Sequence, residues 1–324
     1  RGLQAAGADV VAIASRTLSS AQAQAERFRI PDATDDYLAL LERADIGAVV
    51  ITTPDFTHEE VAVASAEAGK AMLLQKPMAR NSAECRTIME AAQQNDVPLF
   101  VSFMHRYFEE VQQMRGLLEE NALGPIYSIR QRNATPGADW AAWFFKRENV
   151  GGGAMMQLGV HGIDLVRYLF GEIEAVLATT ALMRPQRTLR DGTVVRPDSE
   201  DLVLATYRLA CGALVSHECS YNEVAGTDRF RMEIYGADGT AWLRTQRGDL
   251  ALYAPDHFGQ EGWFAPALPM LPPGLRHHRH FWDMVAGDEP PDTSAADGLA
   301  TLLVCEAIYR SAESGAWEAV SYTH

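Results

Sequence analysis

In the first third of the chain, short apolar runs alternate with longer amphipathic stretches. Strands that are apolar on both faces, separated by helices, are typical of a parallel doubly wound α/β sheet. The expected strands are 8–15, 46–52, 71–74 and 97–103. The expected helices are the end of one closed by Gly7, one opened by Ser19 or Ser20 and running to about 28, one opened by a capping box at 57–60 and ending at 69, and one capped by Asn81–Glu84 and running to about 95.

The carboxyl ends of these strands carry polar segments. They are Ser15-Arg16, Thr52-Thr53-Pro54 and Gln75-Lys76-Pro77. Ligands bind at such strand ends, so the three segments should converge on one crevice. Arg16 bears on the choice of cofactor, because an acidic residue there would bind a ribose 2′-hydroxyl, whereas arginine suits a 2′-phosphate. A solvated turn residue is the alternative interpretation of Arg16.

The pattern changes after residue 104. A helix from 107 to 121 is followed by alternating segments that read as strands, joined by tight turns at 210–212 and 237–239. The expected strands are 126–132, 175–183, 202–209, 213–221, 230–235 and 241–244, and closing helices are expected at 281–285 and 294–314. We therefore expect two domains: 1–104 with the parallel sheet, and 105–324 as an α+β domain with a large, mostly antiparallel open sheet, whose last helix can pack back on the first domain.

Segment 151–168 concentrates the polar chemistry of the chain. Its three leading glycines are expected to take positive φ and approach a ligand closely, and a helix should follow them. At about 100° per residue, one face of that helix carries Gln157, His161, Asp164 and Tyr168. The other faces are apolar, so this polar row needs partners or lines a cavity. His161 is thus a candidate acid/base, and a hydrogen-bonded core histidine is the alternative.

Aromatic residues gather just before this segment, in a loop that contains Trp140, Trp143, Phe144 and Phe145. They can wall a pocket for a polar, ring-shaped substrate or pack between domains. Segment 255–273 is rich in proline and glycine and lacks periodicity. We expect it to cross the surface, with covering the site as the alternative.

The sequence does not indicate a metal site. His161 and Asp164 are spaced for two ligands on one helical turn, but no third or fourth ligand lies near them. The cluster His277, His278 and His280 has no cysteine or carboxylate spacing beside it, so a solvated helix start is the expected interpretation.

Composition narrows the class of protein further. A formal net charge of −15 argues against binding to nucleic acid or an anionic membrane. Four scattered cysteines without a CxxC motif indicate reduced thiols in a cytoplasmic protein, and neither a membrane span nor a signal peptide is visible. The open sheet is expected to be covered by another subunit, which gives a homodimer or homotetramer.

Four motifs occur in order along the chain: Thr52-Thr53-Pro54 with His58 after it, Gln75-Lys76-Pro77, the segment 151–164 from its glycines to Asp164, and 306–311. Together they resemble the Gfo/Idh/MocA family, the glucose-fructose oxidoreductase and inositol dehydrogenase group of NAD(P)-dependent enzymes. The resemblance spans essentially the whole chain. It implies a Rossmann domain, a second domain with an open sheet, and hydride transfer between a nicotinamide and a hydroxyl carbon of a sugar, polyol or related compound.

The resemblance also implies roles for single residues. Lys76 matches a lysine that contacts the nicotinamide ribose and the substrate hydroxyl, His161 matches an acid/base histidine, and Pro77 matches a proline often preceded by a cis bond that would aim Lys76 into the crevice. The expected catalytic residues are Lys76, His161 and Gln157. The expected cofactor-binding residues are Ser15, Arg16, Thr52, Thr53, Pro54, His58, Gln75, Lys76 and Pro77. The expected substrate-binding residues are Lys76, Trp143, Gln157, His161 and Asp164.

Three features depart from the family pattern. Gln75 stands where a glutamate is usual, and Gln157 stands where an aspartate usually precedes the histidine by one turn. A neutral amide can orient an imidazole but cannot offset the positive charge that forms when His161 takes a proton, and Asp164 is our candidate for the missing charge. A first strand with a Gly-x-Gly-x-x-Gly turn is also absent from the numbered chain, so we expect this chain to bind cofactor weakly.

Two hypotheses follow. The first is an NADP-preferring oxidoreductase that acts on a secondary alcohol or ketone of a sugar, polyol or related compound. The second is a catalytically degenerate family member that binds cofactor or sugar as a regulatory subunit.

Overall fold

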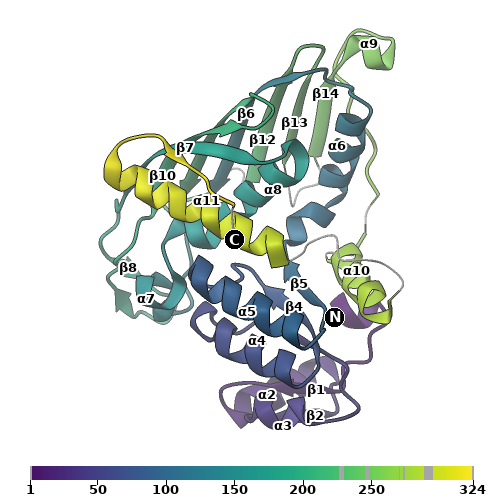
Figure 1. Ribbon diagram of the computed structural model, residues 1–324, viewed down its shortest axis with the longest axis vertical. Coiled ribbons are helices and arrows are strands. Elements are labelled where there is room, and N and C mark those ends of the chain that lie inside the picture. Colours follow the sequence, from purple (N-terminus) through teal and green to yellow (C-terminus); the bar gives the residue numbers. More distant parts are fainter. Residues whose placement is uncertain are drawn as a thin grey trace.

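The computed structural model describes residues 2–225, 230–244, 249–269, 271–272, 274–287 and 295–322. Its first part contains two parallel sheets (Figure 1). One pairs β1 (Ala12–Ala14) with β2 (Asp32–Thr34), and the other has the order β3 (Ala48–Ile51), β4 (Ala71–Gln75), β5 (Leu99–Ser102). The expected parallel strands are confirmed. The strand β2 was not expected, because its three residues contain no apolar run.

The helices of this part are α1 (Gly2–Ala5), α2 (Leu18–Phe28), α3 (Tyr37–Leu41), α4 (His58–Glu67) and α5 (Ser82–Gln94). The expected cap of α5 is confirmed, because the Asn81 side chain accepts the Glu84 N–H. The expected serine start of α2 is wrong, whereas α4 does begin after Thr57 as expected but without the side-chain hydrogen bond of a capping box. Thr17, not a serine, caps α2, and the Thr57 hydroxyl donates to the Pro54 carbonyl because the short helix η1 (Asp55–Thr57) runs directly into α4.

The second part is built on an eight-stranded sheet with the order β14-β13-β12-β6-β11-β10-β7-β15. Only the β6–β11 pair is parallel among these neighbours, which confirms a mostly antiparallel sheet. The strands are β6 (Ile126–Ala134), β7 (Ile173–Ala181), β10 (Leu202–Leu209), β11 (Leu214–Ser220), β12 (Phe230–Gly236), β13 (Thr240–Arg244), β14 (Asp249–Tyr253) and β15 (Glu318–Ala319). β14 was not expected, and β15 and the small β8–β9 hairpin (Arg187–Thr188, Val194–Val195) have only two residues per strand, too few to show a pattern.

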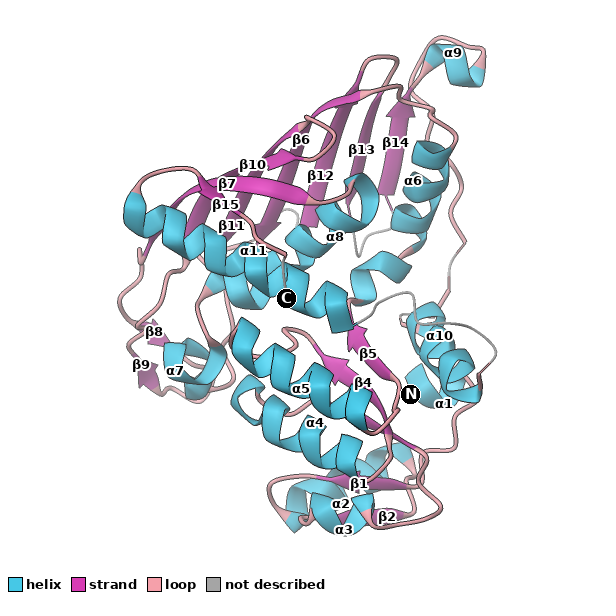
Figure 2. Ribbon diagram, in the orientation of Figure 1, coloured by secondary structure: helices cyan, strands magenta, loops and turns pink. Residues whose placement is uncertain are grey.

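Helices cover one face of this large sheet (Figure 2). They are α6 (Glu109–Glu119), α8 (Val160–Phe170) and α11 (Ala295–Ser314). Along the strands, side chains that face the helices are buried and alternate with side chains that face the other way and are more exposed. Leu204, on the other face, has 55% of its surface accessible. The long α11 also packs on the first domain, where the Glu306 carboxylate accepts the backbone N–H and the hydroxyl of Ser82 at 2.7 and 3.1 Å. The described start of α11 is Ala295, so the expected start at 294 lies outside the described residues.

The remaining elements connect these layers. They are η2 (Met104–Tyr107), η3 (Ala142–Phe145), α7 (Arg147–Val150), the π-helix η4 (Met155–Gly159), α9 (Pro255–Phe258) and α10 (Leu275–Ala286). In Figure 1, α9 lies at the far end of the large sheet from β4 and β5, so this part of segment 255–273 does not cover the strand ends. Within the described ranges, every helix is too short or too polar to span a bilayer.

Candidate active site

The ends of β3 and β4 are joined by a buried histidine. His58 lies within 3.0 Å of the Thr53 carbonyl through Nε2 and within 3.1 Å of the Pro77 carbonyl through Nδ1. Its side chain is 0% exposed, so both ring nitrogens serve the protein. His58 therefore fixes the two strand ends relative to each other rather than offering its ring to a cofactor. Thr52 and Thr53 remain exposed beside it.

Lys76 crosses from this edge of the first domain to the glycine-rich segment. The Lys76–Pro77 peptide bond is cis, as expected. The Lys76 Nζ donates to the backbone carbonyl of Gln157 at 2.7 Å, and its backbone N–H donates to the Gln75 side chain at 2.9 Å. The ammonium group thus reaches the helical turn that precedes His161.

That turn is not α-helical. Residues Met155–Gly159 form a π-helix, in which the Val160 N–H donates to the Met155 carbonyl five residues earlier, and α8 starts only at Val160. Single π-turns inside helices are frequent at functional sites. The polar row expected on one helix face therefore meets several partners. Gln157 contacts Asp55 and His161 packs on His105, while Asp164 and Tyr168 contact arginines farther along.

His161 packs face to face on a second imidazole. The rings of His161 and His105 are stacked with centroids 4.1 Å apart and 19° between their planes, and the Phe230 ring meets both edge-on. His161 is 5% exposed and His105 is 1% exposed. Sequence reasoning missed His105, although its position directly after β5, at the carboxyl edge of the same sheet, could have pointed to it.

Asp164 does not supply charge to His161. Its carboxylate, 1% exposed, is bound by the Arg106 guanidinium through Nε at 2.9 Å and Nη2 at 2.5 Å. Arg106 also reaches Asp297 at 3.1 Å and lies over the Tyr168 ring. This buried network ties η2 to α8 and α11, and it leaves the Asp164 carboxylate engaged away from the crevice.

A different carboxylate lies beside Gln157. Asp55 follows Pro54 at the end of β3, is 6% exposed, and accepts a hydrogen bond from the Gln157 side-chain amide. Burial raises the pKa of Asp55, while His58, the Gln157 amide and the Lys76 ammonium counteract the rise. Sequence reasoning missed this residue too, although it sits in the very motif, Thr52 to His58, that the resemblance singled out.

The three glycines serve packing within the protein, which corrects the expectation that they approach a ligand. A Cβ at Gly151 would collide with the Arg80 carbonyl, one at Gly152 with the Tyr309 hydroxyl, and one at Gly153 with Glu200. Of the three glycines, only Gly151 has the expected positive φ, at 74°. The close approach lets the Glu200 carboxylate accept N–H groups of Gly153 and Met155, each at 3.1 Å, and the Tyr309 hydroxyl at 3.0 Å. Burial raises the pKa of Glu200.

The aromatic loop stands against the turn that carries Asp55. The Trp143 ring meets the neighbouring Phe56 ring edge-on at 6.0 Å, and the Trp140 ring meets Trp143 edge-on at 5.5 Å. Phe56 and Trp140 keep 40% and 59% of their surfaces exposed. Packing and pocket-wall roles are therefore compatible here, since the rings contact one another and still present apolar surface.

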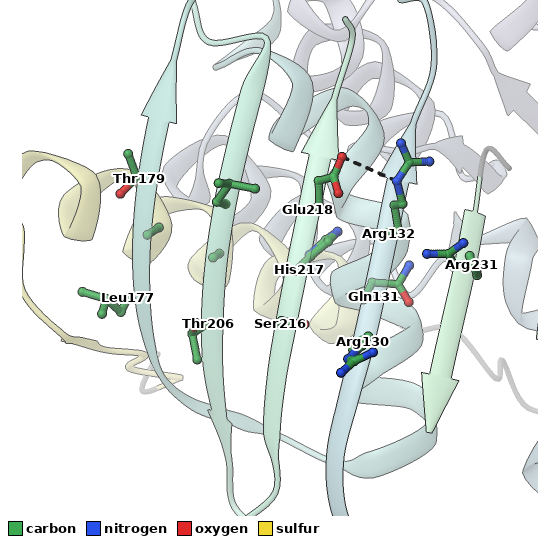
Figure 3. Close-up of a pocket in the computed structure, with 13 residues that line it drawn as sticks. Arg130, Gln131, Arg132, Leu177, Thr179, Thr206, Ser216, His217, Glu218 and Arg231 are labelled. Atoms are coloured by element: carbon green, nitrogen blue, oxygen red, sulfur yellow. Dashed lines mark ion pairs between the residues drawn. The ribbon is translucent and has the colours of Figure 1, made fainter. Parts of the chain in front are cut away.

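The outer face of the large sheet holds a separate hollow of about 510 Å³ (Figure 3). It is lined from β6, β7, β10, β11 and β12, and contains none of the crevice residues. The lining His217 is buried between the sheet and α8, where it hydrogen-bonds Tyr207 and Asn133 at 2.6 Å each, and burial lowers its pKa to about 3. No group of three or more metal-ligating side chains occurs in the described part of the chain.

Comparison with known proteins agrees with this architecture. Residues 2–103 match the model of an oxidoreductase family with an NAD-binding Rossmann fold, and residues 111–242 match the GFO/IDH/MocA C-terminal domain. Levoglucosan dehydrogenase of Pseudarthrobacter phenanthrenivorans is 30% identical over 90% of this chain and 85% of its own length. Inositol 2-dehydrogenase 2 of Saccharopolyspora erythraea is 30% identical over 92% of this chain and 82% of its own length.

Solved structures agree as well. Levoglucosan dehydrogenase in complex with NADH and L-sorbose superposes with a TM-score of 0.90 at 27% identity, over 99% of this chain and 95% of that one. The same enzyme with NADH and levoglucosan gives a TM-score of 0.88 at 29% identity, over 96% and 90% of the two chains. The fold and the crevice define a nicotinamide-dependent oxidoreductase. The chain belongs to the Gfo/Idh/MocA family.

Proposed function

We propose that the protein transfers hydride between a nicotinamide cofactor and a secondary alcohol or ketone of a sugar or polyol. The observation that carries this proposal is the contact between Lys76 of the first domain and the π-turn of the second, one turn before His161. The related levoglucosan and inositol dehydrogenases support the substrate class. The exposed rings of Phe56 and Trp140, with half-buried Trp143 between them in contact with both, offer an apolar wall for a sugar-like ring.

Each residue of the crevice has a part in this reaction. Lys76 and His161 would hold and move the proton of the substrate oxygen, because an ammonium can donate a hydrogen bond to that oxygen and an imidazole can give and take a proton near neutral pH. Gln157 would position Lys76 through its backbone carbonyl, while its side-chain amide donates to Asp55. When bound, the nicotinamide ring accepts or supplies the hydride.

The open strand ends fit a dinucleotide. Ser15, Arg16, Thr52 and Thr53 line the carboxyl edge with exposed or half-buried polar groups, and Pro54, Gln75, Lys76 and Pro77 continue this edge. These residues would hold the cofactor, with His58 fixing the strand ends behind them. We prefer NADP(H) to NAD(H) because exposed Arg16 directly follows β1, although the complexes of levoglucosan dehydrogenase are named for NADH.

Two further features bear on the oligomeric state and the cellular compartment of the protein. The exposed face of the large sheet would be covered by a second copy of the chain, giving a homodimer or homotetramer. Cys85, Cys219 and Cys305 are buried thiols and Cys211 is an exposed one, which suits a reducing compartment such as the cytoplasm.

Activity of the full-length protein tests the proposal. The protein is mixed with NADP⁺ or NAD⁺ and a panel of sugars and inositols, and absorbance at the nicotinamide band is followed. We expect turnover with at least one member, and we expect His161→Ala to lower kcat by about 10²- to 10⁴-fold, as loss of a general acid/base does. A wild type that binds cofactor and sugar but never turns over would instead favour the regulatory-subunit hypothesis, and an unaltered rate in His161→Ala would remove His161 from the mechanism.

A further inference from the structure

We propose that Asp55, on the first domain, supplies to the proton-transfer site the negative charge that Gln157 does not carry. This role rests on the proposed hydride transfer and deepens it. Asp55 would act through Gln157 and through its electric field, so it is a positioning residue rather than a group that touches the reacting atoms.

The contacts form a continuous chain across the crevice. The Asp55 carboxylate accepts the Gln157 side-chain amide, and the backbone carbonyl of the same Gln157 accepts the Lys76 ammonium at 2.7 Å. One residue of the π-turn therefore contacts both an anion and a cation of the first domain. His161 begins the next helical turn, with Val160 as the first residue of α8.

The environment of Asp55 makes its charge effective. The side chain is 6% exposed, so water screens it little, and a charge in such surroundings acts more strongly than a solvated one. Burial raises the pKa of Asp55, while the nearby His58, Gln157 and Lys76 oppose that rise. The Asp55 carboxylate would likewise attract, and so stabilise, a positive charge that develops nearby during proton transfer.

Other buried carboxylates near the π-turn are engaged elsewhere. Asp164 is bound by Arg106 through two guanidinium nitrogens, and Glu200 accepts the N–H groups of Gly153 and Met155. Among the residues that the structure describes, neither carboxylate forms a hydrogen bond with Gln157. The hydrogen bond to Gln157 thus singles out Asp55 as the anion that replaces the aspartate usual at position 157.

An isosteric exchange tests the proposal. Asp55→Asn removes the charge and keeps the shape, and we expect kcat to fall by about 10- to 10³-fold with KM changed by less than about threefold. Asp55→Asn combined with Gln157→Glu restores one amide and one carboxylate in exchanged positions, and should recover at least a tenth of the wild-type kcat. Asp35→Asn, the same change at an exposed position of the first domain, should leave kcat unchanged.

The outcomes separate cleanly. A single variant with wild-type kcat overturns the role of Asp55, and so does a double variant that stays as inactive as the single one. If Asp55→Asn does not fold, as judged by circular dichroism, the double variant decides alone: recovery of a tenth of wild-type kcat supports the role, and a lower value contradicts it. A wild type that transfers no hydride contradicts the proposed function itself, which is a different result.

Discussion

At the scale of single residues, the chemistry of the crevice depends on partners that lie far away in sequence. Lys76 and His161 carry proton-transferring groups that their motifs already indicated. Asp55 and His105 come from turns after β3 and β5 and contact Gln157 and His161, respectively. Arg106 forms an ion pair with Asp164, so this carboxylate does not supply charge to His161.

The preference for NADP(H) is a prediction at this scale. Arg16 is exposed after β1, where its guanidinium can bind a 2′-phosphate but gains nothing from a 2′-hydroxyl. We expect Arg16→Ala to lower kcat/KM for NADP⁺ by about 10- to 100-fold, equivalent to about 1.4–2.7 kcal/mol, and to leave kcat/KM for NAD⁺ within about threefold.

The matched control for this measurement is Arg27→Ala. Arg27 is also exposed and lies on α2, where it rests over the Phe28 ring instead of the strand end. It should change neither specificity constant. Equal loss with both cofactors in Arg16→Ala, or a wild type that favours NAD⁺, would contradict the assignment.

At the scale of elements, the start of the glycine-rich helix is held by residues from two other segments of the second domain. Glu200, which directly precedes β10, and Tyr309 of α11 both bind the Gly153 N–H, and the space they occupy excludes any side chain there. The π-turn follows immediately, so its position depends on this clamp. Packing at residue 153 therefore controls where Gln157 and His161 are placed.

Gly153→Ala should consequently affect both stability and catalysis. Its Cβ would overlap the Glu200 carbonyl, and overpacking of this kind costs about 1–3 kcal/mol of unfolding free energy. The displaced π-turn should also lower kcat, because small misplacements of catalytic groups are costly. Urea denaturation and steady-state kinetics measure the two effects.

Gly116→Ala serves as the control for this prediction. Gly116 lies inside α6 and a Cβ there would meet nothing within 4 Å, so alanine should be neutral or stabilising by up to about 1 kcal/mol. Equal stability of the two variants would show that the clamp does not require glycine at position 153.

At the scale of the whole molecule, the large sheet presents one covered and one exposed face. The exposed face combines apolar Leu204 and Leu214, 55% and 48% accessible, with charged groups such as Arg130 and Glu218 around the hollow shown in Figure 3. Apolar side chains at the centre with charges beside them are a pattern that suits association with a second copy.

We therefore expect light scattering to give a mass in solution that is a multiple of the 35.6 kDa chain. Leu204→Glu, which places a charge in the middle of β10, should shift the protein toward monomer, since burying an unpaired charge is costly. Leu38→Glu is the control, because Leu38 is similarly exposed at 51% but lies in α3 of the first domain. A monomeric wild type at micromolar concentration would contradict the assembly.

Local patterns predicted most of the fold. The strands from β3 to β5 and β10 to β13 were recovered because apolar runs and turn residues mark them directly. Short elements such as β2 and η1 escaped, since three residues carry no period, and η1 changed the start of α4 from a capping box to a continuous turn. The π-helix was not predicted either, because nothing in the sequence of residues 155–159 distinguishes hydrogen bonds to the fifth preceding residue from those to the fourth.

By itself, the sequence determined the alternation of strands and helices and the family resemblance, and it predicted Lys76 and His161 as proton-handling groups, because these depend on residue type and spacing. Only the tertiary structure decided their surroundings. Asp55 and Gln157 are 102 positions apart, and Arg106 and Asp164 are 58 apart, so no local pattern relates them. The chemistry of a buried carboxylate depends on the partner that packing gives it, and here packing gave Asp164 an arginine and Asp55 the Gln157 amide.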